Sequence, residues 1–167
     1  MFYLQLFKAS LSSPKKLAAF RMLPIGKVMK YLFTLVTLIS IVSFLTFTSS
    51  ITSFGEMDVT FPNYMEEMKW ILYPFAIILQ FVVATLLLFT QISIVAYIGL
   101  LIGRVWKRRI EFRQIWRTAA IAYTAPFLVA FILNFFPTSD TVGTFVSFLL
   151  HLVVVLWSVS FYPKNVA

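Results

Sequence analysis

The chain has 167 residues, of which 60% are apolar and only 12% are charged, and its mean hydropathy is +0.91. A soluble domain of this length could not bury so much apolar surface, and a disordered chain would be far less apolar. The formal net charge of +8 arises from bases that sit beside long apolar runs, which argues against nucleic-acid binding. We therefore expect one integral membrane domain over residues 1–167.

Residues 1–27 are basic, with apolar residues at helix-compatible spacing. Ser13 is a predicted N-cap, and Pro14 follows it at the first helical position. The basic region is too long for a typical cleavable signal. We expect an N-terminal amphipathic helix that lies on the inner membrane interface, with a loose cytoplasmic tail as the alternative.

Four apolar segments account for the composition: residues 28–48, 70–103, 118–136 and 142–162. Each has about the 20 residues that a helix needs to cross about 30 Å of hydrocarbon. Lipid offers no partner for unpaired backbone groups, so these segments are expected to be helices. The sequence thus predicts an all-α, polytopic membrane bundle with four transmembrane helices. The segment 70–103 exceeds the bilayer core, and we interpret it as one long tilted helix, with a kink or a late start at Pro74.

The charges divide between two sides of this bundle. Residues 1–30 carry six bases and residues 103–117 carry six bases with one acid, whereas residues 49–70 carry four acids and one base. Thirteen of the 14 bases then fall on one side. Short loops rich in Lys and Arg stay cytoplasmic. We expect a multi-pass protein of the bacterial plasma membrane, with both termini in the cytoplasm.

Five polar side chains inside the apolar segments are candidates for contacts between helices or for a polar path through the bundle. They are Gln80, Gln91, Asn134, Ser147 and His151. His151 is the only histidine, and no acid lies at membrane depth to serve it in a proton relay or a metal site. We expect a neutral, hydrogen-bonded histidine. A Ser147–His151 nucleophile pair fits the spacing but lacks a third group to orient the base.

Motifs of soluble enzyme chemistry do not occur. The chain has no cysteine, no phosphate-binding glycine loop, no zinc-binding His-Glu-x-x-His and no EF-hand pattern. We therefore expect no catalytic, cofactor-binding or metal-binding residues, and a protein that is not an enzyme.

The loop between the second and third apolar segments is the most charged stretch. Arg104 and Arg117 flank the segments, and the bases between them are Lys107, Arg108, Arg109 and Arg113. Bases interleaved with aromatic and aliphatic residues suit the anionic headgroups of the inner leaflet, or a protein partner. The alternative is a topology signal alone.

Two blocks carry a resemblance to a known family. One is residues 7–21, FKASLSSPKKLAAFR, continued by Ile25-Gly-Lys and Tyr31, and the other is residues 112–126, FRQIWRTAAIAYTAP. Both resemble the bacterial membrane family called domain of unknown function 1189, which is similar to the Yip-domain membrane proteins. Many members have a much longer external segment between helices one and two than residues 49–69 here. The resemblance implies no catalytic residues.

These observations leave three hypotheses for function. The first is a non-enzymatic accessory protein that binds and modulates another membrane protein, such as a transporter, sensor or envelope complex, or that forms a homo-oligomer. The second is a small transporter or lipid carrier with a polar site near Gln80, Gln91, Asn134 and His151. The third is an intramembrane enzyme. Recovery of a stoichiometric partner favours the first, and flux through the reconstituted protein favours the second.

Overall fold

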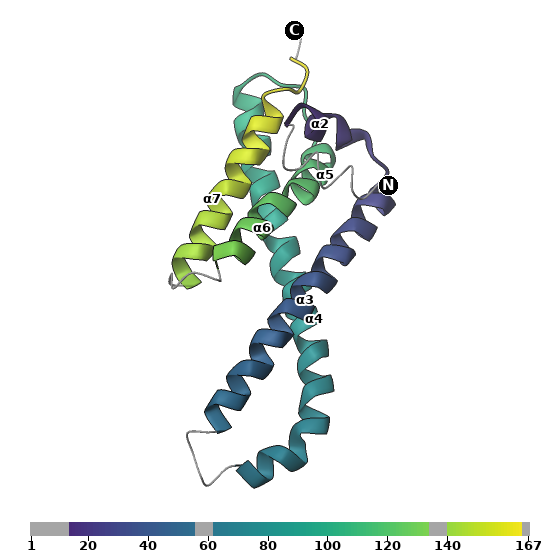
Figure 1. Ribbon diagram of the computed structural model, residues 1–167. Coiled ribbons are helices and arrows are strands. Elements are labelled where there is room, and N and C mark those ends of the chain that lie inside the picture. Colours follow the sequence, from purple (N-terminus) through teal and green to yellow (C-terminus); the bar gives the residue numbers. More distant parts are fainter. Residues whose placement is uncertain (1–13, 56–61, 134–139, 165–167) are drawn as a thin grey trace. The chain divides into compact units, whose positions relative to one another are not determined.

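The structure is a computed structural model that describes residues 14–55, 62–133 and 140–164 (Figure 1). These residues are helical apart from short connections, and none of them lies in a strand. In chain order the elements are α2 (Pro14–Ala19), η1 (Phe20–Met22), α3 (Ile25–Gly55), α4 (Pro62–Val105), α5 (Phe112–Ala122), α6 (Thr124–Leu133) and α7 (Asp140–Val159). The all-α prediction is therefore confirmed.

Four stretches are long and apolar enough to cross a membrane: Ile25–Thr48, Trp70–Val105, Phe112–Leu133 and Val142–Val159. This confirms the prediction of four transmembrane helices. The boundaries differ by a few residues, since the first stretch begins before residue 28 and the last one ends before residue 162.

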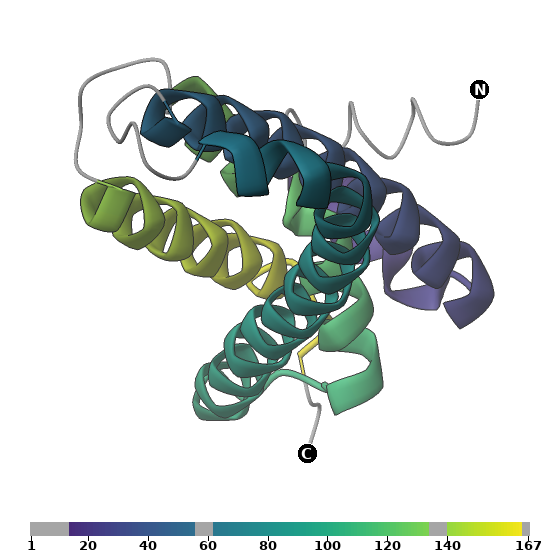
Figure 2. The same cartoon turned by 90° about the horizontal axis from the view of Figure 1, so that it is seen from below.

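Helix α4 has 44 residues, which corresponds to about 66 Å of helix at about 1.5 Å per residue. It continues through Pro74, as the expectation of one long helix requires, and it begins at Pro62 rather than at residue 70. Figures 1 and 2 show its first turns set at an angle to the remainder. Because a proline inside a helix removes one backbone hydrogen bond, a bend near Pro74 is the expected result.

The third predicted span, residues 118–136, is present as the apolar stretch Phe112–Leu133, but its helix is interrupted at one residue. Helix α5 ends at Ala122 and α6 begins at Thr124, with Tyr123 between them. Pro126 has no N–H to donate to the carbonyl of Ala122, so the helical ladder is interrupted at this point. Helix α5 also begins at Phe112, because the polar residues before the apolar run are good helix formers that hydropathy does not detect.

Backbone contacts divide the chain into two compact units. Unit 1 consists of the described residues up to Leu32 and from Phe89 onward, and unit 2 consists of those within Phe33–Leu88. In unit 1, α5 and α6 both pack against α7, and α2 packs against α5 and α7. The fully buried side chains of unit 1 include Leu17, Val28, Leu32, Ile92, Ile115, Ile121 and Val155.

The predicted amphipathic interfacial helix at the N-terminus is not confirmed. Residues 1–13, with the proposed N-cap Ser13, lie outside the described residues. From Pro14 the chain forms the short helices α2 and η1, and Leu17 is only 1% exposed. This apolar residue joins the protein core of unit 1 rather than the bilayer surface.

Within unit 1, Gly99 and Gly103 bring α4 close to its neighbours. A Cβ atom added to Gly103 would lie 2.1 Å from Cδ1 of Ile110 and 3.0 Å from Cγ1 of Val159. One added to Gly99 would lie 3.3 Å from Cγ1 of Val155. The Gly-x-x-x-Gly spacing thus allows the backbone of α4 to approach α7.

The C-terminus of α4 has a Schellman motif that turns the chain toward the end of α7. Lys107 has a φ of 52°, and its N–H donates to the carbonyl of Arg104 at 2.9 Å, while the N–H of Arg108 donates to Gly103 at 3.0 Å. This position usually holds glycine, since a side chain disfavours the left-handed conformation. The N–H of Arg109 then donates to the carbonyl of Pro163 at 2.9 Å, which ties the loop to the chain that follows α7.

Candidate functional site

Buried polar side chains of unit 1 gather around the break between α5 and α6. The carbonyl of Ile121 accepts a hydrogen bond from Oγ1 of Thr124 at 2.9 Å. The hydroxyl of Tyr31, on α3, lies 2.5 Å from the same Oγ1. Since the one hydroxyl hydrogen of Thr124 is directed to Ile121, Tyr31 acts as the donor in this second bond. A tyrosine from the first span thus supports the interruption in the third.

Two side chains of α7 bind backbone carbonyls on either side of the break. Oγ of Ser147 donates to the carbonyl of Pro126 at 3.1 Å, and Nε2 of His151 pairs with the carbonyl of Ala119 at 2.9 Å. A carbonyl can only accept, so Nε2 carries the hydrogen. The ring of Tyr123 meets the histidine ring edge-on, with centroids 5.4 Å apart. We call Tyr31, Tyr123, Thr124, Ser147 and His151 the break cluster.

In the break cluster, His151 packs against Tyr123 and forms a hydrogen bond with a backbone carbonyl. The side chain is fully buried, and its Nδ1 has no hydrogen-bond partner among the described residues. A nucleophilic Ser147 would need to donate to this histidine, but its hydroxyl donates to Pro126 instead. The described residues contain no group of three or more His, Cys, Asp or Glu side chains placed to hold a metal ion.

The other three predicted intramembrane residues are placed differently. Asn134 lies outside the described residues. Gln80 lies in unit 2 and Gln91 in unit 1, both half-buried on α4. Neither amide has a hydrogen bond to any side chain or backbone group that the structure describes. The residues expected to share one polar site are therefore not shown to converge.

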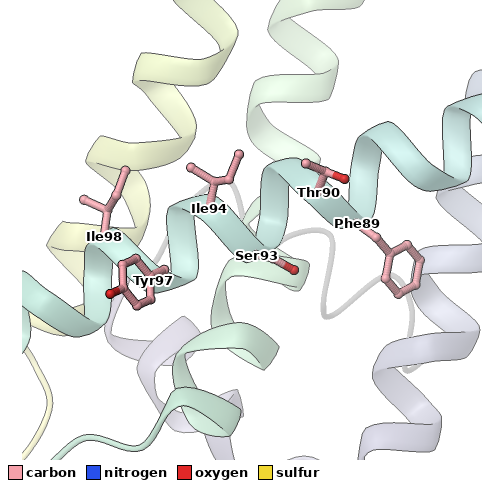
Figure 3. Close-up of a pocket in the computed structure, with 6 residues that line it drawn as sticks. All are labelled: Phe89, Thr90, Ser93, Ile94, Tyr97 and Ile98. Atoms are coloured by element: carbon pink, nitrogen blue, oxygen red, sulfur yellow. The ribbon is translucent and has the colours of Figure 1, made fainter.

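An open apolar groove of about 500 Å³ runs along the part of α4 that belongs to unit 1. It is lined by Phe89, Thr90, Ser93, Ile94, Tyr97 and Ile98, all of α4 (Figure 3). Nε1 of Trp116, on α5, donates to Oγ of Ser93 at 3.3 Å. The indole ring also lies 5.8 Å from the ring of Phe89, centroid to centroid. One of the three hydroxyl groups that line the groove, that of Ser93, is thus already bonded to the protein's own tryptophan.

The four bases predicted to contact lipid or a partner fall into two groups. Lys107, Arg109 and Arg113 have exposed side chains. Arg108 does not share this freedom, because its Nη1 donates to the carbonyl of Tyr162 at 2.6 Å. Its guanidinium fastens the loop to the residues after α7, a role that the sequence pattern does not indicate.

A second polar cluster, which the sequence analysis missed, surrounds Tyr162. The tyrosine is almost fully buried, and its hydroxyl lies 2.6 Å from Oγ1 of Thr118. The guanidinium carbon of Arg21 lies 5.0 Å from the centre of the tyrosine ring. Burial raises the pKa of the Tyr162 hydroxyl, although Thr118 and Arg21 partly oppose this shift, so the group is neutral near pH 7.

Two further bases complete these surroundings. Nη1 of Arg117 donates to the carbonyl of Arg21 at 3.4 Å, and Nζ of Lys15 lies 5.5 Å from the centre of the Phe161 ring. We call Lys15, Arg21, Arg108 and Arg117 the base cluster. Its members come from positions up to 102 residues apart, and a single sequence without covariation carries no signal that could bring them together.

The chain matches a known protein family. No curated protein and no solved structure matches the chain. One family model, described as "Protein of unknown function (DUF1189)", matches residues 57–161. This range contains the second of the two sequence blocks, residues 112–126, together with the last three spans. The chain belongs to this family, as the two blocks indicated.

Proposed function

We propose that this chain is a non-enzymatic accessory protein of the bacterial plasma membrane. In this proposal, α4 binds another membrane protein, or a second copy of the chain, and the contact modulates the complex that forms. The observation that carries the proposal is the unpaired amide of Gln91 within a membrane span.

The position of Gln91 makes an unpaired amide costly. Thirteen residues separate it from Arg104 at the basic end of α4, which is about 20 Å along a helix. With Arg104 at the interface, the amide lies within the roughly 30 Å hydrocarbon core. Leaving a polar group unpaired in an apolar medium costs about 2–7 kcal/mol, depending on the reference state. A partner helix that offers a donor or acceptor removes this penalty.

The surroundings of α4 support the same proposal. The span Trp70–Val105 is much less buried than the span Phe112–Leu133. In the most apolar 18-residue stretch of each span, 11% of the residues are buried in the first and 44% in the second. Exposed apolar side chains alone do not require a protein partner, because lipid tails accommodate them equally well. The amide is the feature that lipid cannot satisfy.

The basic segments determine the proposed orientation of the chain in the membrane. Both termini and the α4–α5 loop would face the cytoplasm, where exposed Lys107, Arg109 and Arg113 meet anionic headgroups. Cysteine labelling in intact cells tests this orientation, with Gln114 expected to be protected and Ser53 and Ser139 accessible. External labelling at Gln114 would contradict it.

The test of the accessory role is purification of the tagged chain from its native membranes in mild detergent. We expect a stoichiometric membrane-protein partner or a defined oligomer. Changing Gln91→Leu should weaken the complex by about 5- to 30-fold, the equivalent of an interhelical hydrogen bond of about 1–2 kcal/mol. Thr85→Val is the matched control, because the hydroxyl of Thr85 donates to the carbonyl of Phe81 in its own helix at 2.7 Å.

Two outcomes would refute the proposal. One is a monomer with no stoichiometric partner, and the other is a complex that Q91L leaves as strong as T85V does. Flux of solute or lipid through the reconstituted, isolated chain would instead support the transport hypothesis.

A further inference from the structure

The base cluster lacks the anions that normally accompany so many cations. Among residues 14–55, 62–133 and 140–164, none of Lys15, Arg21, Arg108 and Arg117 forms an ion pair. Their contacts are backbone carbonyls and aromatic ring faces. Unit 1 has two acids among its described residues. Glu111 is exposed, and Asp140 begins α7 at the end opposite Tyr162.

Most hydrogen-bond donors of these guanidinium groups are unused. Each guanidinium has five N–H groups. Arg108 and Arg117 each donate one hydrogen bond, from Nη1 to a carbonyl. The Nε atoms of both are buried and have no partner among the described residues. Buried charged donors without acceptors are unfavourable, which indicates that an acceptor belongs beside them.

The position of the cluster at the ends of the membrane spans indicates which molecule supplies that acceptor. Lys15 and Arg21 precede the first span, Arg108 follows the second, Arg117 lies in the first turns of the third, and Tyr162 follows the fourth. In a chain that crosses the membrane four times, these points all lie at the same face. The cluster therefore sits at the level where phospholipid phosphates lie.

We propose that the base cluster is a binding site for a phosphate group. Guanidinium forks match the oxygen pairs of phosphate and form charge-assisted hydrogen bonds with them. The headgroup of an anionic phospholipid and free inorganic phosphate share this chemistry. The proposal concerns a site around the buried Tyr162, to which the half-buried Arg21, Arg108 and Arg117 and the exposed Lys15 belong, and not the exposed loop bases Lys107, Arg109 and Arg113. It rests on the proposed orientation only in assigning a lipid ligand to the inner leaflet, and the labelling of Gln114 tests that orientation separately.

The experiment measures the thermal stability and lipid binding of the full chain in three settings. These are phosphatidylcholine nanodiscs, the same nanodiscs with phosphatidylglycerol added, and phosphatidylcholine nanodiscs with inorganic phosphate in the buffer. Stabilisation by phosphatidylglycerol alone identifies a lipid headgroup as the ligand. Stabilisation by inorganic phosphate identifies a site for the free anion. No stabilisation in either setting overturns the proposal.

A pair of double variants tests the location of the site. R21Q/R117Q removes two bases of the cluster, and K16Q/R104Q removes two exposed bases outside it and lowers the net charge equally. We expect R21Q/R117Q to weaken binding about tenfold or more, as the loss of charged hydrogen bonds implies. We expect K16Q/R104Q to bind as the wild type does. Equal loss in both variants, or loss in K16Q/R104Q alone, contradicts the proposal. If R21Q/R117Q fails to fold, the nanodisc comparison with the wild-type chain still decides whether a phosphate group binds, and loss of binding in K16Q/R104Q still contradicts the assigned location.

Discussion

The two units of this protein use side-chain hydrogen bonds in different ways. In unit 1 several of these bonds connect separate helices, as those of Tyr31, Ser147 and His151 do, while the hydroxyl of Thr118 also donates within its own helix. In unit 2 the hydroxyls of Thr37 and Thr85 donate to carbonyls four residues earlier in their own helices. Side-chain hydrogen bonds thus join the helices of unit 1 to one another. Unit 2 consists of long helices whose backbone groups form their hydrogen bonds within the same helix.

The difference follows from the broken helix. A continuous helix in lipid needs no neighbour to satisfy its backbone, since each interior carbonyl already has a partner. Pro126 cannot donate to the carbonyl of Ala122, and beside this interruption two side chains of α7 bind the carbonyls of Pro126 and Ala119. Burying a polar side chain is favourable only when it is hydrogen-bonded, and the carbonyls beside the break accept these hydrogen bonds. Where the helices are unbroken, apolar side chains facing lipid suffice.

The largest effect on the free energy of unfolding should come from truncating a buried side chain in unit 1. Ile115 is fully buried, and Ile115→Ala should lower the free energy of unfolding by about 2–5 kcal/mol. The matched change in unit 2 is Ile78→Ala, where the side chain is 65% exposed and the expected loss is within about 0.5 kcal/mol. Denaturation in detergent measures both. Equal losses would show that the two units do not differ in packing as we describe.

A smaller effect is expected where α4 approaches α7. Gly103→Ala should cost about 1–3 kcal/mol, because the new methyl group would meet Val159 and Ile110. Gly143→Ala is the control, since a Cβ there would meet nothing within 4 Å, and helix propensity should make this change neutral or stabilising by up to about 1 kcal/mol. The same denaturation assay compares them. Equal stability of the two variants would mean that the close approach at Gly103 is absent.

The smallest effect concerns His151 in the break cluster. His151→Gln should cost at most about 1–2 kcal/mol, the scale of one hydrogen bond between helices. The carbonyl of Ala119 would keep a second donor, the N–H of Tyr123 at 3.1 Å. Partner recovery should be unchanged in this variant. Complete loss of function with normal expression and assembly would instead indicate a proton-carrying or metal-binding role.

The sequence was sufficient for the features that depend on local composition. The hydropathy pattern predicted all four spans and a single helix α4 that continues through Pro74. Both predictions depend only on the length of the apolar runs. It did not detect that α5 begins at Phe112, because charged residues can extend a helix beyond the hydrocarbon. Nor did it predict which way Pro126 would act, because a proline produces either a kink or a break, depending on the groups packed around it.

Candidate sites were harder to predict for a similar reason. The polar character of Ser147 and His151 is visible in the sequence, but their acceptors are backbone carbonyls of other helices. The bases of the loop are equally visible, yet Arg108 differs from its neighbours only through its contact with Tyr162, 54 residues away. Such pairings arise from tertiary packing, which the pattern of one chain does not encode locally.

The central claim is that Gln91 contacts another protein in the membrane, and site-specific photo-crosslinking in native membranes tests it most directly. A photoreactive residue at position 91 should give a discrete protein adduct under ultraviolet light. The same residue at Val153, an exposed position on α7, should react with lipid and give no protein adduct. Lipid adducts alone at position 91, or the same protein adduct from both positions, would contradict the account.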